Sequence, residues 1–214
     1  MVKIWRGIWV NWSWESKEDI KTCKGDTWKM KGISLIVGQK GSGKSTVLNI
    51  INALGFYTTE LAEHLKYLEF EGKRRTDLEG DCWSDSAISL ACENGLRNFE
   101  GQVFLSGIAR PSEIEYLQKE SISYEIISIS VDENLRYKRT RERGRQGEEN
   151  LSLSKYQEMC ERRLGNFRGY ESNDLNGLMR LSNFNISNEG TFEDLYLKTK
   201  DMMLKRGHIV WKFI

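Results

Sequence analysis

One eight-residue stretch, Gly-Gln-Lys-Gly-Ser-Gly-Lys-Ser at residues 38–45, constrains the fold of this chain more than any other feature. It matches the pattern G-x-x-x-x-G-K-[ST], a loop whose backbone N–H groups surround a phosphate at the start of a helix. An apolar run at residues 33–37 leads into the loop, and apolar residues at helical spacing follow it. Because the pattern requires a strand before it and a helix after it, this context predicts a site for a nucleoside triphosphate.

The last two residues of the loop are expected to do most of its chemistry. Lys44 is placed to reach the β- and γ-phosphates, and the Ser45 hydroxyl is placed to ligate Mg²⁺. ATP and Mg²⁺ are therefore the expected cofactors. The residues expected to contact the nucleotide in and beside the loop are Gly38, Gln39, Lys40, Gly41, Ser42, Gly43, Lys44, Ser45 and Thr46.

The composition argues against some functions. With 214 residues, a net charge of +1 and a pI near 7.6, the chain gives no general argument for binding nucleic acids or membranes. No apolar run approaches the length of a membrane span. The four cysteines form no C-x-x-C pair, which is typical of reduced thiols, so we expect a cytoplasmic protein.

Strand and helix patterns alternate along the chain. Strands are predicted at residues 33–37, 56–59, 102–105, 125–131 and 184–187, and helices at 44–54, 61–70, 84–98, 112–119, 132–143, 152–164 and 192–205. Strands that alternate with helices form parallel sheets covered on both faces. We therefore expect a three-layer α/β fold with a five-stranded parallel sheet and helices on both faces, in a domain spanning residues 32–206.

The two ends of the chain lie outside that domain. Five of the seven tryptophans fall within residues 1–31, where apolar side chains at alternate positions indicate a half-buried strand. The apolar run near the C-terminus indicates a further strand at residues 207–214. We expect these segments to form extra β structure, paired with each other.

A set of arginines follows the fourth predicted strand. Arg136, Arg139 and Arg143 share one helix face, and Arg145 comes just beyond. Such a set can close over transferring phosphates, where negative charge develops, or it can form a solvated basic surface. Beside a phosphate loop we favour a lid at residues 139–150, with Arg139, Arg143 and Arg145 as catalytic residues.

Several further segments occur in the order found in one kinase group. They are residues 55–66, an R-x-x-L element at 75–78, a stretch ending in Glu-Ile-Glu-Tyr-Leu at 104–117, the arginine-rich segment at 136–145 and the turn at 186–191. Over roughly residues 32–205 the chain resembles the nucleoside monophosphate kinases. The resemblance is to the branch of dephospho-CoA kinase-like and viral or archaeal deoxynucleotide monophosphate kinase-like proteins, and it implies that the domain at residues 32–206 has the P-loop kinase fold.

This resemblance implies roles for further residues. Arg75 and Arg110 would hold the acceptor's phosphate, Glu63 at the end of the second strand would orient or deprotonate the attacking group, and Asn188 would lie in the turn that contacts adenine. The family usually has an acidic residue at the end of the third strand, where this chain has Ser106. Asp81 or Asp85 would be the candidates to replace that acid.

The leading hypothesis is an ATP-dependent phosphotransferase that moves the γ-phosphoryl group of ATP to a small phosphorylated acceptor, with a (deoxy)nucleoside monophosphate favoured. One alternative is a kinase acting on a hydroxymethylated base in DNA, with the N-terminal tryptophans stacking on bases. DNA binding is not favoured, since these side chains more simply pack against the sheet edge. Another alternative is a nucleotide-binding ATPase or interaction module without an acceptor. The oligomeric state is left open.

Overall fold

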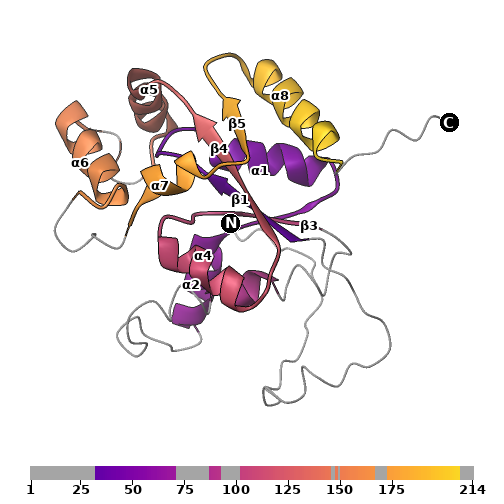
Figure 1. The fold of residues 1–214 in the computed structure, drawn as a ribbon. Coiled ribbons are helices and arrows are strands. Elements are labelled where there is room, and N and C mark those ends of the chain that lie inside the picture. The colour runs from indigo at the N-terminus through magenta and orange to yellow at the C-terminus, as the bar shows by residue number, and fades with distance from the viewer. Residues whose placement is uncertain are drawn as a thin grey trace, which may run out of the picture.

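A five-stranded, all-parallel sheet in the order β2-β3-β1-β4-β5 forms the centre of the structure (Figure 1). The computed structural model describes residues 32–70, 87–92, 102–145, 148, 150–166 and 173–207. The strands are β1 (Gly32–Val37), β2 (Tyr57–Glu60), β3 (Gln102–Ser106), β4 (Tyr124–Ser130) and β5 (Phe184–Ser187). The predicted α/β fold with five parallel strands is therefore confirmed.

Helices connect the strands and cover the sheet. They are α1 (Lys44–Ala53), α2 (Leu61–Phe70), α4 (Pro111–Lys119), α5 (Glu133–Arg143), α6 (Leu153–Arg163), α7 (Leu175–Arg180) and α8 (Phe192–Lys205), with a further helical stretch at residues 87–92. The short α7 was not expected from the sequence. Asp174 caps it by accepting a hydrogen bond from the N–H of Gly177. The helix is too short for apolar periodicity to predict it, and this cap is the local signal for its start.

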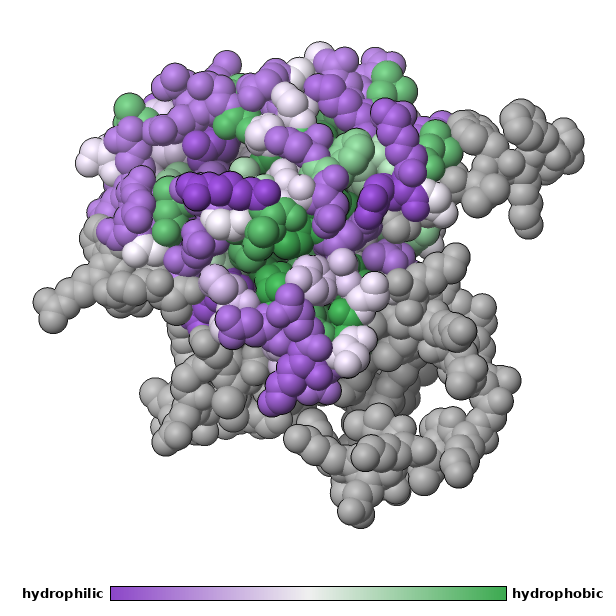
Figure 2. Space-filling view, in the orientation of Figure 1, coloured by the Kyte–Doolittle hydropathy of each residue, from purple (hydrophilic) through white to green (hydrophobic). Residues whose placement is uncertain are grey.

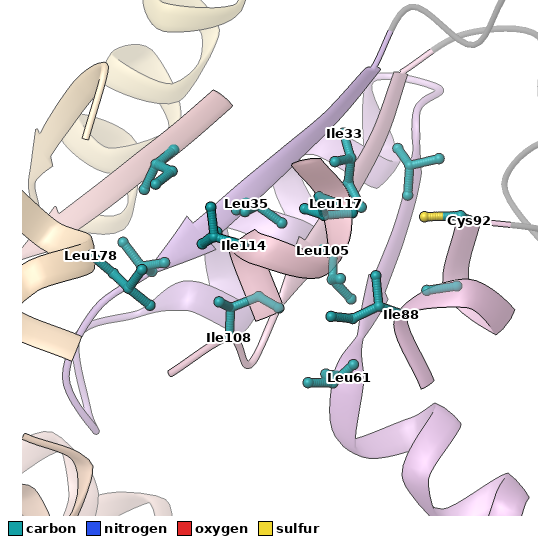
Figure 3. Close-up of a cluster of buried hydrophobic side chains, with 14 of the residues drawn as sticks. Ile33, Leu35, Leu61, Ile88, Cys92, Leu105, Ile108, Ile114, Leu117 and Leu178 are labelled. Atoms are coloured by element: carbon teal, nitrogen blue, oxygen red, sulfur yellow. The ribbon is translucent and has the colours of Figure 1, made fainter. Parts of the chain in front are cut away.

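Two hydrophobic cores hold the helices against opposite faces of the sheet. Alternate residues of β1 point to opposite sides, so Leu35 enters one core and Ile36 the other. The first core, shown in Figure 3, joins the sheet to α2, α4, α7 and residues 87–92. The second joins it to α1 and α8. The predicted three-layer arrangement, with helices on both faces, follows from this alternation.

A third, smaller core lies between α5 and α6. Tyr156 and Cys160 of α6 are buried with Leu151, and Tyr137 of α5 packs against them. This contact makes α5 and α6 one unit beside the main sheet, at the edge where β1 and β4 end (Figure 1). On the face shown in Figure 2 hydrophilic residues predominate, and the hydrophobic ones gather near the middle.

Several predicted features lie outside the described residues. They are the tryptophan-rich segment at 1–31, the helix at 84–98 beyond its described residues 87–92, Arg75, Asp81 and Asp85, and the strand at 207–214 except Gly207, which ends the turn after α8. Their predicted structures and roles stay predictions.

Candidate active site at the carboxyl edge of the sheet

The phosphate loop joins β1 to α1 at the carboxyl edge of the sheet, where open α/β sheets bind ligands. Gly41 and Gly43 have φ angles of 80° and 97°, which favour glycine, and an added Cβ would collide with Arg136 O at the first and Asn188 Nδ2 at the second. The N–H of Ser42 donates to Gln39 O at 3.2 Å. Glycine is thus required at these positions both by conformation and by the close approach of α5 and of the turn after β5.

Lys44 curls back over this loop. Its Nζ donates to the carbonyl oxygens of Gly38 at 2.8 Å and Gln39 at 2.9 Å. Burial, followed by the charge of Arg163, lowers its pKa from 10.5 to about 7, and the nearby Glu60 opposes the shift. Burial and nearby cations therefore outweigh the one nearby carboxylate and bring this lysine close to losing its proton.

Three arginines of α5 and α6 supply the nearby positive charge. Arg163, Arg143 and Arg136 each lower the pKa of Lys44 through their positive charge. Burial lowers the pKa of Arg163 itself, while the carboxylate of Glu113 favours its charged form. The four cations gather where the triphosphate of a bound nucleotide is expected, which is the charge distribution that phosphoryl transfer requires.

Sequence reasoning missed Arg163. It lies in the last turn of α6 next to Arg162, and the sequence pattern does not tell which of the two faces the loop. Arg162 instead forms an ion pair with Glu158. The one available signal was a second basic helix end after the predicted lid.

The second strand brings a carboxylate to the loop. Ser45 Oγ donates a hydrogen bond to Glu60 Oε1. Glu60 is the last residue of β2 and pairs in register with Ser106, the last residue of β3. The expectation that Glu63 ends the second strand is wrong, because β2 extends to Glu60 and Glu63 lies exposed in the first turn of α2.

Ser45 and Glu60 offer the oxygen ligands that Mg²⁺ prefers. Mg²⁺ typically takes one or two protein oxygens and completes its octahedron with water and substrate phosphates. A hydroxyl and a carboxylate that already share a hydrogen bond fit this requirement. Within the described part of the chain, no group of three or more His, Cys, Asp or Glu side chains is placed to hold a metal ion by itself.

Arg136 connects α5 to α6 and to the loop. Its Nε donates to Val131 O at 3.1 Å and its Nη1 to Tyr156 Oη at 3.0 Å. The Tyr156 hydroxyl in turn donates to Lys40 O at 2.8 Å, and burial raises the pKa of Tyr156. A neutral tyrosine therefore stands between the guanidinium of Arg136 and the backbone of the phosphate loop, and it fixes the distance between them.

The predicted lid arginines reach different places. Arg143 ends α5, lies near Lys44 and pairs with Glu148, whereas Arg145 is exposed beyond the helix. Arg139 is turned toward the segment after β5, where its Nη1 donates to Asn188 O at 2.8 Å and its Nη2 to Gly190 O at 3.4 Å. The structure thus brings Arg143 to the phosphate loop and places Arg139 on the side of the predicted adenine turn.

Asn188 is a structural link in that turn. Its side chain is buried, and Nδ2 donates to Ser42 O of the phosphate loop at 2.9 Å. Its backbone N–H donates to Ser130 O at the end of β4, at the same distance. With its amide engaged in this way, Asn188 supports the loop rather than presenting a side chain to a base.

Arg110 lies at the same sheet edge, at the start of α4. Its N–H and that of Ala109 donate to the buried Glu113 carboxylate at 2.8 and 2.7 Å. Its Nε donates to Asn173 Oδ1 at 3.4 Å, and Asn173 Nδ2 donates to Arg162 O. Asn173 therefore links the arginine predicted to bind the acceptor to the end of α6, which also carries Arg163.

Comparisons with known proteins agree with this geometry at the level of the fold. No protein-family model matches the chain. Its sequence is 23% identical over 178 residues to a UPF0200 protein of Methanothermobacter thermautotrophicus, a match that covers 79% of this chain and 88% of that protein.

Two similar solved structures are kinases by their descriptions. A gluconokinase from Sinorhizobium meliloti 1021 matches with a TM-score of 0.52 and 18% identity, over 84% of this chain and 95% of the other. A shikimate kinase from Bacteroides thetaiotaomicron matches with a TM-score of 0.52 and 11% identity, over 82% and 98%. The chain has the α/β fold of these P-loop kinases; identities this low carry the fold and not the substrate. No helix in the described ranges combines the length and apolar character that crossing a membrane requires.

Proposed function

We propose that this chain is an ATP-dependent phosphotransferase that moves the γ-phosphoryl group of ATP to a small phosphorylated acceptor, with a (deoxy)nucleoside monophosphate favoured. The observation that carries the proposal is the gathering of Arg136, Arg143 and Arg163 around Lys44. Phosphoryl transfer needs little covalent chemistry from the protein and much positive charge at fixed positions. A regulatory nucleotide site needs the loop but not this many cations beside it.

Each basic residue of the site has a role that depends on its position. Lys44 binds the β- and γ-phosphates, and Arg143 and Arg163 stabilise the negative charge that develops on the transferring group. Arg136 holds α5 and α6 at the loop through Tyr156. Arg139 contacts the turn predicted to bind adenine, where a planar guanidinium can stack on a purine ring.

Ser45 and Glu60 hold the metal ion in this proposal. They would hold Mg²⁺ beside the triphosphate, and the ion would supply positive charge that offsets the charge of the phosphates. Glu60 takes the role that the family assigns to an acidic residue at the position of Ser106, because the two residues pair in register on neighbouring strands. The alternatives Asp81 and Asp85 are then not needed.

The acceptor binds beside Arg110 and the end of α6. A guanidinium in this place can hold an acceptor phosphate through two hydrogen bonds. The phosphate of a nucleoside monophosphate is already ionised and needs no base. A hydroxyl acceptor, such as the gluconate or shikimate in the names of the two structural neighbours, would need a carboxylate to take its proton.

The decisive experiment measures transfer from labelled ATP to a panel of acceptors. The panel contains ribo- and deoxynucleoside monophosphates, dephospho-CoA, gluconate, shikimate and hydroxymethylated DNA. Transfer to a monophosphate that disappears in Lys44→Met is the expected result. Phosphate release that is independent of every acceptor would instead identify a nucleotide-binding ATPase.

A second variant separates the two roles open to Glu60. Glu60→Gln keeps the side-chain volume and removes the charge. If Glu60 supports the metal, raising the Mg²⁺ concentration restores much of the activity. If it serves as the base for a hydroxyl acceptor, the loss of kcat persists at every Mg²⁺ concentration.

A further inference from the structure

Glu148, in the connection after α5, contacts the phosphate loop. One of its oxygens lies 2.9 Å from Lys40 Nζ. Arg143 donates to the same carboxylate from Nε at 3.1 Å and from Nη2 at 2.7 and 2.9 Å. Only 6% of Glu148 is exposed, so this is a buried carboxylate held between two cations rather than a surface ion pair.

The contacts of Glu148 keep its carboxyl group ionised. Burial by itself would raise the pKa of this carboxyl, but hydrogen bonds from Arg143 and Lys40 hold the pKa below its usual range. The carboxylate is therefore ionised under all ordinary conditions. Two cations and one anion leave an excess positive charge next to the phosphate loop, so the group still attracts a polyphosphate.

The hydrogen bonds to Glu148 determine which nitrogen of the Arg143 guanidinium stays available to a phosphate. Glu148 engages Nε and Nη2, and no hydrogen bond within the described residues engages Nη1. The positive charge of Arg143 lowers the pKa of Lys44, so the two side chains lie near each other. A long side chain at a helix end otherwise samples many rotamers, and fixing it in advance removes that entropic cost from the step that uses it.

We propose that Glu148 is a positioning residue that aims the free Nη1 of Arg143 at the γ-phosphate and ties the lid to the phosphate loop through Lys40. The inference rests on the proposed phosphotransferase site and adds to it a carboxylate that touches no substrate. Its effect on phosphoryl transfer passes through Arg143, so removing Glu148 lowers kcat mainly while Arg143 is present.

The first test compares binding of two nucleotides by calorimetry in Mg²⁺ to wild-type protein and to Glu148→Gln. The variant is expected to bind the triphosphate analogue AMP-PNP about ten-fold more weakly, with ADP affinity changed less than about two-fold. Glu142→Gln, an exposed carboxylate on α5 paired with Lys138, is the matched control and is expected to bind both like wild type. Equal losses for both nucleotides in Glu148→Gln would mean a merely structural role and overturn the proposal.

The second test is a double-mutant cycle on kcat with Arg143→Ala. Glu148→Gln is expected to lower kcat about ten-fold in the wild-type background and less than about two-fold in Arg143→Ala. The same loss in both backgrounds would refute action through Arg143. Should Glu148→Gln fold poorly, Glu148→Asp, which keeps the charge on a shorter side chain, takes its place in both tests with smaller changes of the same sign.

The proposed function and the proposed role of Glu148 can be refuted separately. A wild-type protein that binds AMP-PNP more tightly than ADP but transfers phosphate to no acceptor would remove the proposed function and leave the role of Glu148 in place. A wild-type protein that transfers phosphate while Glu148→Gln behaves like Glu142→Gln would remove the role of Glu148 alone.

Discussion

The unusual acidity of Lys44 predicts how ATP affinity changes with pH. Without nucleotide its pKa is about 7, because burial and the charges of Arg163 and Arg143 disfavour the ammonium. Phosphate oxygens within hydrogen-bonding reach favour the ammonium, so ATP binding raises this pKa. Above pH 7, binding must therefore take up a proton, and the affinity falls as the pH rises.

The size of the effect follows from the linkage between the two equilibria. With a pKa of about 7 in the free protein and full protonation in the complex, raising the pH from 7.0 to 8.5 weakens binding roughly fifteen-fold. With the ordinary pKa of 10.5, the same change of pH would leave the affinity unaltered. Ionisation of the terminal phosphate, with a second pKa of about 6, is nearly complete in this range and acts in the opposite direction.

Calorimetry of Mg²⁺-AMP-PNP binding in buffers of different ionisation enthalpy measures this proton directly. At pH 8.5 the expected uptake approaches one proton per nucleotide bound, and Lys44→Met is expected to lose it. An uptake near zero in the wild type would refute the reasoning. The same shift makes the nucleotide-free protein more stable as the pH rises from about 7, because the unfolded lysine keeps its proton to a higher pH than the folded one.

Three further predictions concern single residues. Arg163→Ala is expected to lower kcat ten- to a thousand-fold in the labelled-ATP assay. The control is Arg141→Ala, at an exposed arginine of α5, which is expected to keep kcat within about two-fold of wild type. Equal kcat values in the two variants would show that Arg163 has no role in the chemical step. Asn188→Ala removes the donor to Ser42 O and is expected to weaken AMP-PNP binding about ten-fold; unchanged affinity would contradict its support of the loop. Ile127→Ala, fully buried in β4, is expected to lower the free energy of unfolding by about 2–5 kcal/mol in urea titrations, and a loss below about 1 kcal/mol would contradict its place in the core.

The sequence was most informative where the structure is local. The phosphate loop, its strand and its helix form one continuous segment, so residues 38–45 carry both the pattern and its structural context. The strands could be found because each is short and followed by a helix, and because β1, β3 and β4 are rich in apolar residues. The strand order and the burial of α7 depend on contacts between distant segments, and no local pattern records them.

The arginines show why a correctly predicted helix does not determine which groups its side chains contact. Arg139 and Arg143 occupy the same face of α5, one turn apart, which separates them by about 6 Å along the axis. That distance is enough for Arg139 to reach the turn at Asn188 while Arg143 reaches Glu148 and the region of Lys44. The periodicity grouped the two residues correctly, but which target each one meets depends on elements that follow much later in the chain.

Glu60 shows how a missing residue type can be supplied by a neighbouring strand. In a parallel sheet adjacent strands lie about 4.8 Å apart, and residues paired in register point to the same face. Glu60 and Ser106 are such a pair, and Ser106 is in turn paired with Ile36, at the base of the phosphate loop. A glutamate one strand farther from the loop has the longer side chain needed to reach Ser45. The serine at the end of β3 therefore does not by itself argue against catalysis, because a carboxylate on the neighbouring strand contacts the Ser45 hydroxyl.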